Sequence, residues 1–199
     1  YPLVRGNEGR ALVNASSYWT IANRVSYFFN LTGPSMAIDA ACASSLTAIH
    51  MACESIRRGE SIMAIAGGVN LNLHPDKHRA LEQAGMIASA RTSRSVGRGD
   101  GFIPAEGVGA VVLKPLELAL RDGDRIYGVI RASAVNHGGT GPGFATPSLK
   151  AQADLIIRTF EESGIPAETV AYVEAATNGS SLGDPMEIAA LTQEFRQFT

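Results

Sequence analysis

The sequence has no marked excess of charge of either sign and no long hydrophobic run. Its 199 residues include 17 Lys and Arg against 19 Asp and Glu, which gives a formal net charge of −2. Such a balance provides no broad basic surface for nucleic acid or for an anionic membrane. No apolar stretch approaches the roughly 20 residues that cross a bilayer as a helix. We therefore expect neither a nucleic-acid partner nor a membrane partner.

Cysteine is also scarce, and Cys42 and Cys53 are the only two in the chain. Both belong to one predicted helical segment and lie too far apart along it to form a disulfide. Two free thiols are typical of proteins in a reducing compartment. We therefore predict a cytoplasmic location.

What the sequence does contain is an alternation of apolar runs and helical patterns. Hydrophobic residues make up 45% of the chain, which is enough for one domain with a core. Apolar runs predict strands at 36–39, 61–71, 108–113, 125–136 and 170–174. Periodic apolar positions predict helices at 20–29, 44–58, 74–84, 115–121, 149–162 and 185–195. The alternation predicts a layered α/β fold with buried strands and with helix 44–58 inside the domain.

Small residues surround Cys42 in the segment DAACASS at positions 39–45. They allow a strand to turn sharply into a helix without side-chain collisions. A thiol at the N-terminus of such a helix lies at the positive end of the helix dipole, which favours the thiolate. A free cysteine can equally be a small buried hydrophobic side chain. The segment alone leaves both interpretations of Cys42 open.

Residues 33–46, GPSMAIDAACASSL, resemble the active-site block of β-ketoacyl synthases in the form found in modular polyketide synthases. The resemblance continues in order through AGGVN at 66–70, GFIPAEG at 101–107, VLKPL at 112–116, DGDRIY at 122–127 and SLGDP at 181–185. It implies a thiolase-like layered αβαβα fold, of which residues 1–199 form the middle portion of a single domain. It also implies that Cys42 accepts the acyl chain, that acyl carrier protein domains are partners, and that the intact domain is a homodimer. This portion should then expose apolar surface.

A second block, VEAATNGSSLGDP at 173–185, departs from the family, which reads VEAHGTGT before SLGDP. Counting back from Asp184 puts the family's catalytic histidine at Ala176 and its two threonines at Asn178 and Ser180. Asn178 and Ser180 can still hydrogen-bond to a pantetheine arm. A methyl group cannot stabilise the enolate of a decarboxylating malonyl thioester, and a lost donor of this kind costs a factor of roughly 10² to 10³.

The departure implies an acyltransferase that passes its chain on without condensation, like the non-elongating ketosynthases of trans-acyltransferase systems. Two alternatives stay open. One is an ordinary condensing enzyme in which a neighbour such as Asn178 replaces the imidazole. The other is a catalytically silent dimerisation or scaffold module. They are distinguished by carbon dioxide release and by the reactivity of Cys42.

The remaining histidines carry weaker signals. His137 opens a glycine-rich loop and is predicted to have a structural or entrance-lining role. His74 and His78 share a helical face with Glu82 but do not make a complete metal site. We therefore predict no metal site. We also predict no bound cofactor, because the resemblance implies that the substrates are carried on the phosphopantetheine of the acyl carrier protein.

Overall fold

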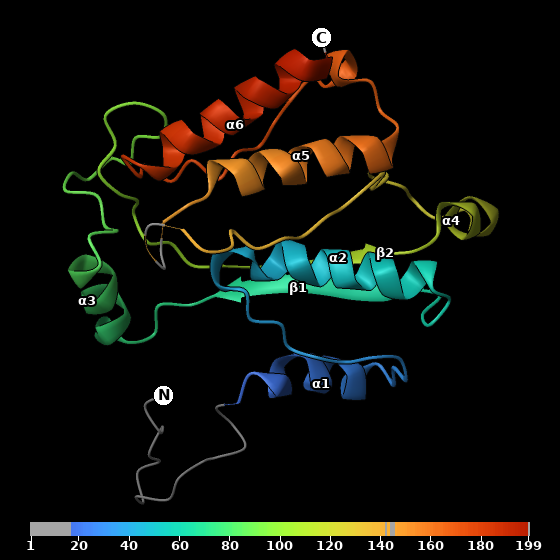
Figure 1. The fold of residues 1–199 in the computed structure, drawn as a ribbon. Coiled ribbons are helices and arrows are strands. Elements are labelled where there is room, and N and C mark those ends of the chain that lie inside the picture. Colours follow the sequence, from blue (N-terminus) through green and yellow to red (C-terminus); the bar gives the residue numbers. More distant parts are fainter. Residues whose placement is uncertain (1–16, 142, 144–145, 199) are drawn as a thin grey trace, which may run out of the picture. The chain divides into compact units, whose positions relative to one another are not determined.

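The computed structural model describes residues 17–141, 143 and 146–198 (Figure 1). Six helices and two strands run along this part of the chain in the order α1 (Trp19–Phe28), α2 (Ser44–Arg57), β1 (Ala64–Asn70), α3 (Pro75–Gln83), β2 (Gly107–Leu113), α4 (Leu116–Asp122), α5 (Leu149–Ser163) and α6 (Gly183–Phe198). Two 3-10 turns, η2 (Ala41–Ala43) and η3 (Ala167–Thr169), precede α2 and follow α5. The ends of the predicted 1–199 domain lie outside the described residues.

The chain divides into two compact units, each taken by itself below. The first comprises residues 1–68 and 109–126, and the second comprises residues 69–108 and 127–199. Strands β1 and β2 pair in a two-stranded sheet.

In the first unit, glycine lets α2 approach the sheet closely. A Cβ atom at Gly68 would lie 2.8 Å from the Cβ of Ser45, in the first turn of α2. At Gly67 a Cβ would lie 2.5 Å from the Gly109 carbonyl oxygen on β2. Side chains at these two positions would separate the helix and the strands, so the glycines fix where α2 begins relative to β1.

Helix α2 confirms the predicted helix and is followed by Gly59, whose φ of +73° is a left-handed conformation that favours glycine. Its predicted burial is wrong, because no residue of α2 is fully buried. The predicted strand 61–71 appears as β1, but there too only Ala66 is buried. A two-stranded sheet is too narrow to cover a 14-residue helix on more than one side.

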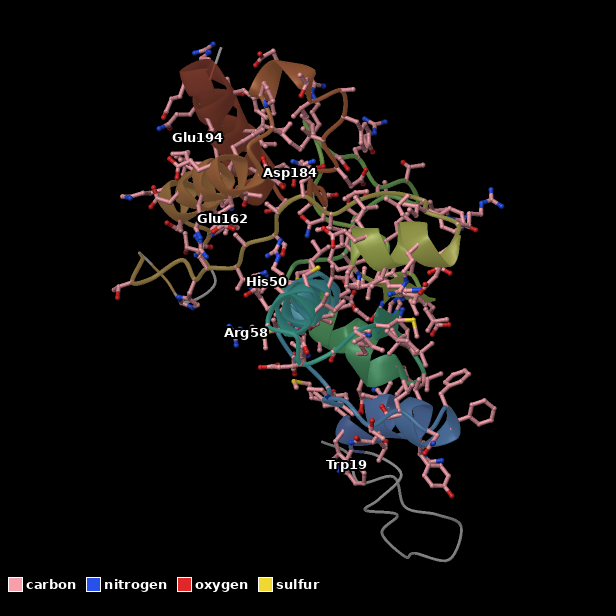
Figure 2. All side chains as sticks on the ribbon, turned by 90° about the vertical axis from the view of Figure 1, so that its right-hand side faces the viewer. Trp19, His50, Arg58, Glu162, Asp184 and Glu194 are labelled. Atoms are coloured by element: carbon pink, nitrogen blue, oxygen red, sulfur yellow. The ribbon has the colours of Figure 1, made fainter. Side chains whose placement is uncertain are left out.

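In the second unit, α5 and α6 pack side by side (Figure 1). The rings of Phe160 and Phe195 meet edge to face with centroids 5.4 Å apart. Helix α5 is capped by the Ser148 hydroxyl, which accepts from the Ala151 N–H at 3.2 Å, and it ends at Gly164 in the left-handed region. Two buried carboxylates, Asp184 and Glu194, both belong to α6 (Figure 2).

The predicted strands at 125–136 and 170–174 are not strands in the structure. An extended segment becomes a strand only when a neighbouring strand pairs with its backbone, and neither segment has such a neighbour among the described residues. Their apolar side chains are accordingly exposed, including Tyr127, Val129, Ile130, Tyr172 and Val173. This confirms the prediction that the chain exposes apolar surface.

Candidate active site

Cys42 lies on the 3-10 turn η2, directly before α2, in an irregular backbone segment. The residue before it, Ala41, has a φ of +50°. The left-handed region costs a residue with a Cβ roughly 1 to 2 kcal/mol, and such conformations cluster at functional sites. The predicted strand at 36–39 is wrong, because no neighbouring strand pairs with it in the described part of the chain. The sharp turn into the helix is nevertheless present.

Two side chains hold this turn by binding its backbone. Asp39 Oδ1 accepts from the Ala41 N–H at 3.1 Å. Ser44 Oγ accepts from the Ala40 N–H at 2.9 Å and donates to the Ala41 carbonyl at 2.7 Å. Both polar groups of the Ala41 backbone are therefore bound to side chains. The left-handed residue is held on each side, which keeps Cys42 at the start of the helix.

The two cysteines differ in environment. Cys42 is exposed, whereas Cys53 is only partly accessible on α2. Burial raises the pKa of the Cys53 thiol, and the nearby Arg57 guanidinium offsets only part of that effect. Cys42 is therefore the more accessible of the two thiols.

The second-unit block at 173–185 is organised by a buried carboxylate at the start of α6. Asp184 is only 4% exposed; its side chain is labelled in Figure 2. Its Oδ2 accepts from the Gly179 N–H at 3.0 Å and from the Val96 N–H at 3.1 Å. Its Oδ1 accepts from the Ser180 N–H at 3.1 Å. One carboxylate thus ties the loop to the segment around residue 96, using three charge-assisted hydrogen bonds.

A second carboxylate of α6 binds the backbone at Ala176, the position predicted to correspond to the family's histidine. Glu187 Oε1 accepts from the Ala176 N–H at 2.8 Å, and Oε2 accepts from the Thr177 N–H at 3.0 Å. These two backbone donors are therefore bound to Glu187. The Ala176 side chain itself is a methyl group in an exposed position.

The predicted pantetheine-binding residues lie together in one turn. The Ser180 N–H also lies 3.3 Å from Asn178 Oδ1, and Ser180 Oγ accepts from the Gly183 N–H at 2.9 Å. Asn178 is exposed and Ser180 is half-buried. Between them, Gly179 has a φ of +87°, and a Cβ there would lie 3.1 Å from the Arg94 carbonyl oxygen. Cys42 belongs to the first unit and is described separately.

Sequence reasoning gave no role to four side chains that the structure puts at these two places: Asp39, Ser44, Asp184 and Glu187. Asp184 and Glu187 did carry a signal. Acidic residues three apart at the start of a helix commonly bind backbone N–H groups of the preceding loop. Asp39 and Ser44 had the same kind of signal, because short polar side chains beside a turn bind its backbone.

His137 is bound within its own loop, where its Nδ1 accepts from the Gly139 N–H at 2.9 Å. His74 Nδ1 likewise lies 3.2 Å from the Asp76 N–H at the start of α3. Within residues 17–141, 143 and 146–198, no group of three His, Cys, Asp or Glu side chains is placed to hold a metal ion. In the same residues, no helix is both long and apolar enough to cross a membrane.

Comparison with known proteins identifies the family. The family model for the β-ketoacyl synthase N-terminal domain matches residues 4–119, and the model for the C-terminal domain matches residues 127–199. The chain is 55% identical over 181 residues to polyketide synthase PksR of Bacillus subtilis, covering 91% of this chain and 7% of PksR. It is 48% identical over 196 residues to polyketide synthase ThaG of Burkholderia thailandensis, covering 98% of this chain and 4% of ThaG.

Two solved structures are similar throughout the matched region. The oxazolomycin ketosynthase domain OzmH KS7 of Streptomyces albus is 49% identical, with a TM-score of 0.90 over 92% of this chain and 32% of that one. The ketosynthase from module 6 of the bacillaene synthase of Bacillus subtilis is 39% identical, with a TM-score of 0.91 over 98% of this chain and 35% of that one.

The chain therefore belongs to the β-ketoacyl synthase family. The relatives to which it is similar are the ketosynthase domains of polyketide synthases, including a module of the bacillaene synthase. The predicted thiolase-like fold is confirmed by the likeness to these domains. The chain spans about a third of the length of the two solved domains. This explains why its helices and strands are less covered than predicted.

Proposed function

We propose that this chain belongs to a ketosynthase domain of a polyketide synthase that accepts an acyl chain on Cys42 and passes it on without decarboxylative condensation. The chain would reach Cys42 as a thioester on the phosphopantetheine of an acyl carrier protein. Asn178 and Ser180 would bind the pantetheine arm. The intact domain would be a cytoplasmic homodimer, of which residues 1–199 are one continuous part.

The acylation step needs groups that the elbow retains. The Cys42 thiolate attacks the thioester carbonyl, a new C–S bond forms, and the pantetheine sulfur leaves and takes up the proton that Cys42 gave up. The attacking sulfur lies at the positive end of α2, which has no acidic residue in its first turn. The Cys42 backbone N–H is a candidate donor to the oxyanion of the tetrahedral intermediate.

Ala176 is the observation that carries the non-elongating part of the proposal. Condensation requires a donor for the enolate oxygen that forms when malonyl thioester loses carbon dioxide. At the position that the family resemblance gives to the histidine, the side chain is a methyl, and the Ala176 and Thr177 N–H groups are already bound by Glu187. A carboxylate is an acceptor and repels an enolate, so Glu187 does not substitute for the imidazole.

The test uses the intact ketosynthase domain, an acyl-pantetheine thioester and intact-mass spectrometry. We expect a covalent acyl adduct that Cys42→Ala abolishes and Cys53→Ala leaves in place. With malonyl-carrier protein added, we expect no carbon dioxide above background and no β-ketoacyl product. Restoring the imidazole by Ala176→His should recover little condensation, because Thr177 and Asn178 also differ from the family's Gly and Thr and set the ring's position.

The possible results separate the three readings of the chain. A β-ketoacyl product from the unaltered domain would identify an ordinary condensing enzyme. No acyl adduct with any thioester tested, together with a Cys42 thiol inert to alkylation, would identify a scaffold module. A monomeric intact domain in light scattering would contradict the homodimer alone.

A further inference from the structure

The backbone at Ala41 is bound by side chains from both flanks of the turn. Asp39 holds its N–H and Ser44 holds its carbonyl, while the same Ser44 hydroxyl accepts from the Ala40 N–H. A residue with a Cβ at φ +50° is unfavourable unless its surroundings hold it there. We refer to Asp39 and Ser44 together as the elbow clamp.

We propose that the elbow clamp positions Cys42 for acyl transfer, so that Asp39 and Ser44 are positioning residues of the reaction. The inference rests on the proposed acylation of Cys42. Ala41 is joined to Cys42 by one peptide bond, and that bond carries the Cys42 N–H. Rotation of the Ala41 backbone therefore moves the nucleophilic sulfur and the candidate oxyanion donor together. A clamp on both polar groups of Ala41 fixes their shared orientation.

Acylation depends on the position of the thiol, whereas alkylation depends on its accessibility. Comparing the two rates therefore distinguishes a positioning role of the clamp from an effect on access. Attack on a bound thioester requires the sulfur and the oxyanion donor to be in place at once, and a 1 Å misplacement can cost about a hundredfold. Alkylation by iodoacetamide requires only an accessible thiolate. Cys42 is exposed, so a small rotation of the turn is expected to leave its thiol accessible to a small reagent.

The experiment measures both rates on the intact ketosynthase domain. Ser44→Ala and Asp39→Ala should each lower the rate of Cys42 acylation by an acyl-pantetheine thioester by about ten- to a hundredfold. Alkylation of Cys42 by iodoacetamide should change by less than about threefold. Circular dichroism and thermal unfolding confirm that each variant is folded before rates are compared.

Conservative variants test the same point without removing the hydrogen bonds. Ser44→Thr keeps a hydroxyl and Asp39→Asn keeps the Oδ1 acceptor, so both should retain acylation within about threefold of the unaltered domain. Retention of acylation in Asp39→Asn would show that the hydrogen bond matters rather than the charge.

Ser55→Ala is the matched control, because Ser55 is hydrogen-bonded to Ser61 at 2.9 Å near the far end of the same helix. It should leave both rates unchanged.

Two results would overturn the inference. Equal loss of acylation and alkylation in the alanine variants would mean that the clamp controls access or folding. Normal acylation in both alanine variants would mean that it does not position the thiol. These differ from failure of the proposed function, in which the unaltered domain itself forms no acyl adduct.

Discussion

The elbow around Cys42 and the loop at 173–185 depart from the family pattern to very different degrees. The elbow keeps the cysteine, the small neighbours and a turn held by side-chain hydrogen bonds. The loop keeps the SLGDP ending, and the resemblance predicts that Ala176 stands where the family has histidine. In the proposed function, acylation depends on the first region, whereas condensation would depend on both. This contrast is the basis for proposing transfer without chain extension.

The hydrogen bonds that hold the loop do not involve the side chain at position 176. The loop's backbone N–H groups are bound by Asp184 and Glu187, neither of which contacts the side chain at position 176 in any hydrogen bond. Replacing an imidazole by a methyl there removes a donor and leaves these bonds unchanged. The fold of the loop and its chemistry are therefore separable, and a sequence can retain the first without the second.

Removal of the Asp184 charge should have the largest effect on stability of the changes considered. It should disrupt the loop at 173–185 and leave the elbow at Cys42 intact. In Asp184→Asn, an amide nitrogen replaces one of the two acceptor oxygens, so either the Ser180 N–H or the Gly179 and Val96 N–H groups lose their acceptor, and the remaining bonds lose the charge. A buried hydrogen bond to a charged group contributes about 1.5 to 3 kcal/mol. We expect the free energy of unfolding of the intact domain to fall by about 3 kcal/mol in urea titration.

Asp154→Asn is the control, because Asp154 forms only an exposed pair with Lys150 on α5. Its expected cost is below about 0.5 kcal/mol. Under folding conditions, Asp184→Asn should leave iodoacetamide alkylation of Cys42 unchanged, since Asp184 binds the loop and the segment at Val96 and not the turn at Cys42. A large fall in Cys42 alkylation in that variant would show that the two regions are not independent.

The helices were largely predictable from the sequence, because their signals are local. Periodic apolar residues and terminal Gly59 and Gly164 located α2 and α5 to within a residue or two. Pro75 correctly marked the start of α3. The position of Cys42 before a helix also followed from local small residues. These features depend on contacts within a few residues, so a short stretch of sequence is enough to predict them.

The strands and the hydrogen-bond partners were less predictable, because they depend on distant residues. The apolar run at 125–136 predicts a strand, yet strand formation needs a pairing neighbour that no local pattern supplies. The bond from Val96 to Asp184 joins residues 88 positions apart. Spacing predicts that Ala176 occupies the family's histidine position, but only the structure places Glu187 on its N–H.

The alkylation rates of the two cysteines should differ by at least about tenfold in the folded domain. Such a difference would distinguish the exposed elbow from the rest of helix α2. Burial disfavours the Cys53 thiolate and raises the pKa of this thiol. Its alkylation should therefore stay slow through neutral pH and rise only above the usual thiol pKa. Cys42 is exposed and should alkylate faster at neutral pH.

Peptide mapping after iodoacetamide treatment between pH 7 and 10 measures both sites, and denatured protein provides the reference in which the two react alike. In Cys42→Ser, labelling of Cys53 should still require the higher pH. Equal rates in the folded domain at pH 7 would remove the distinction between the elbow and the rest of its helix.

The smallest expected effect concerns backbone strain next to the loop. Val96 has a φ of +51°, which is unfavourable for a β-branched residue, and its side chain is 58% exposed. In Val96→Gly, the left-handed conformation costs nothing sterically, while the flexible unfolded chain offsets part of the gain. The N–H that binds Asp184 is retained. We expect the free energy of unfolding to rise by about 0.5 to 1 kcal/mol.

Val108→Gly is the control, because Val108 is also exposed but lies in β2 without a positive φ. This change should therefore destabilise the domain. Destabilisation by Val96→Gly as well would mean that the exposed valine side chain stabilises the segment and that Asp184 does not hold it against strain.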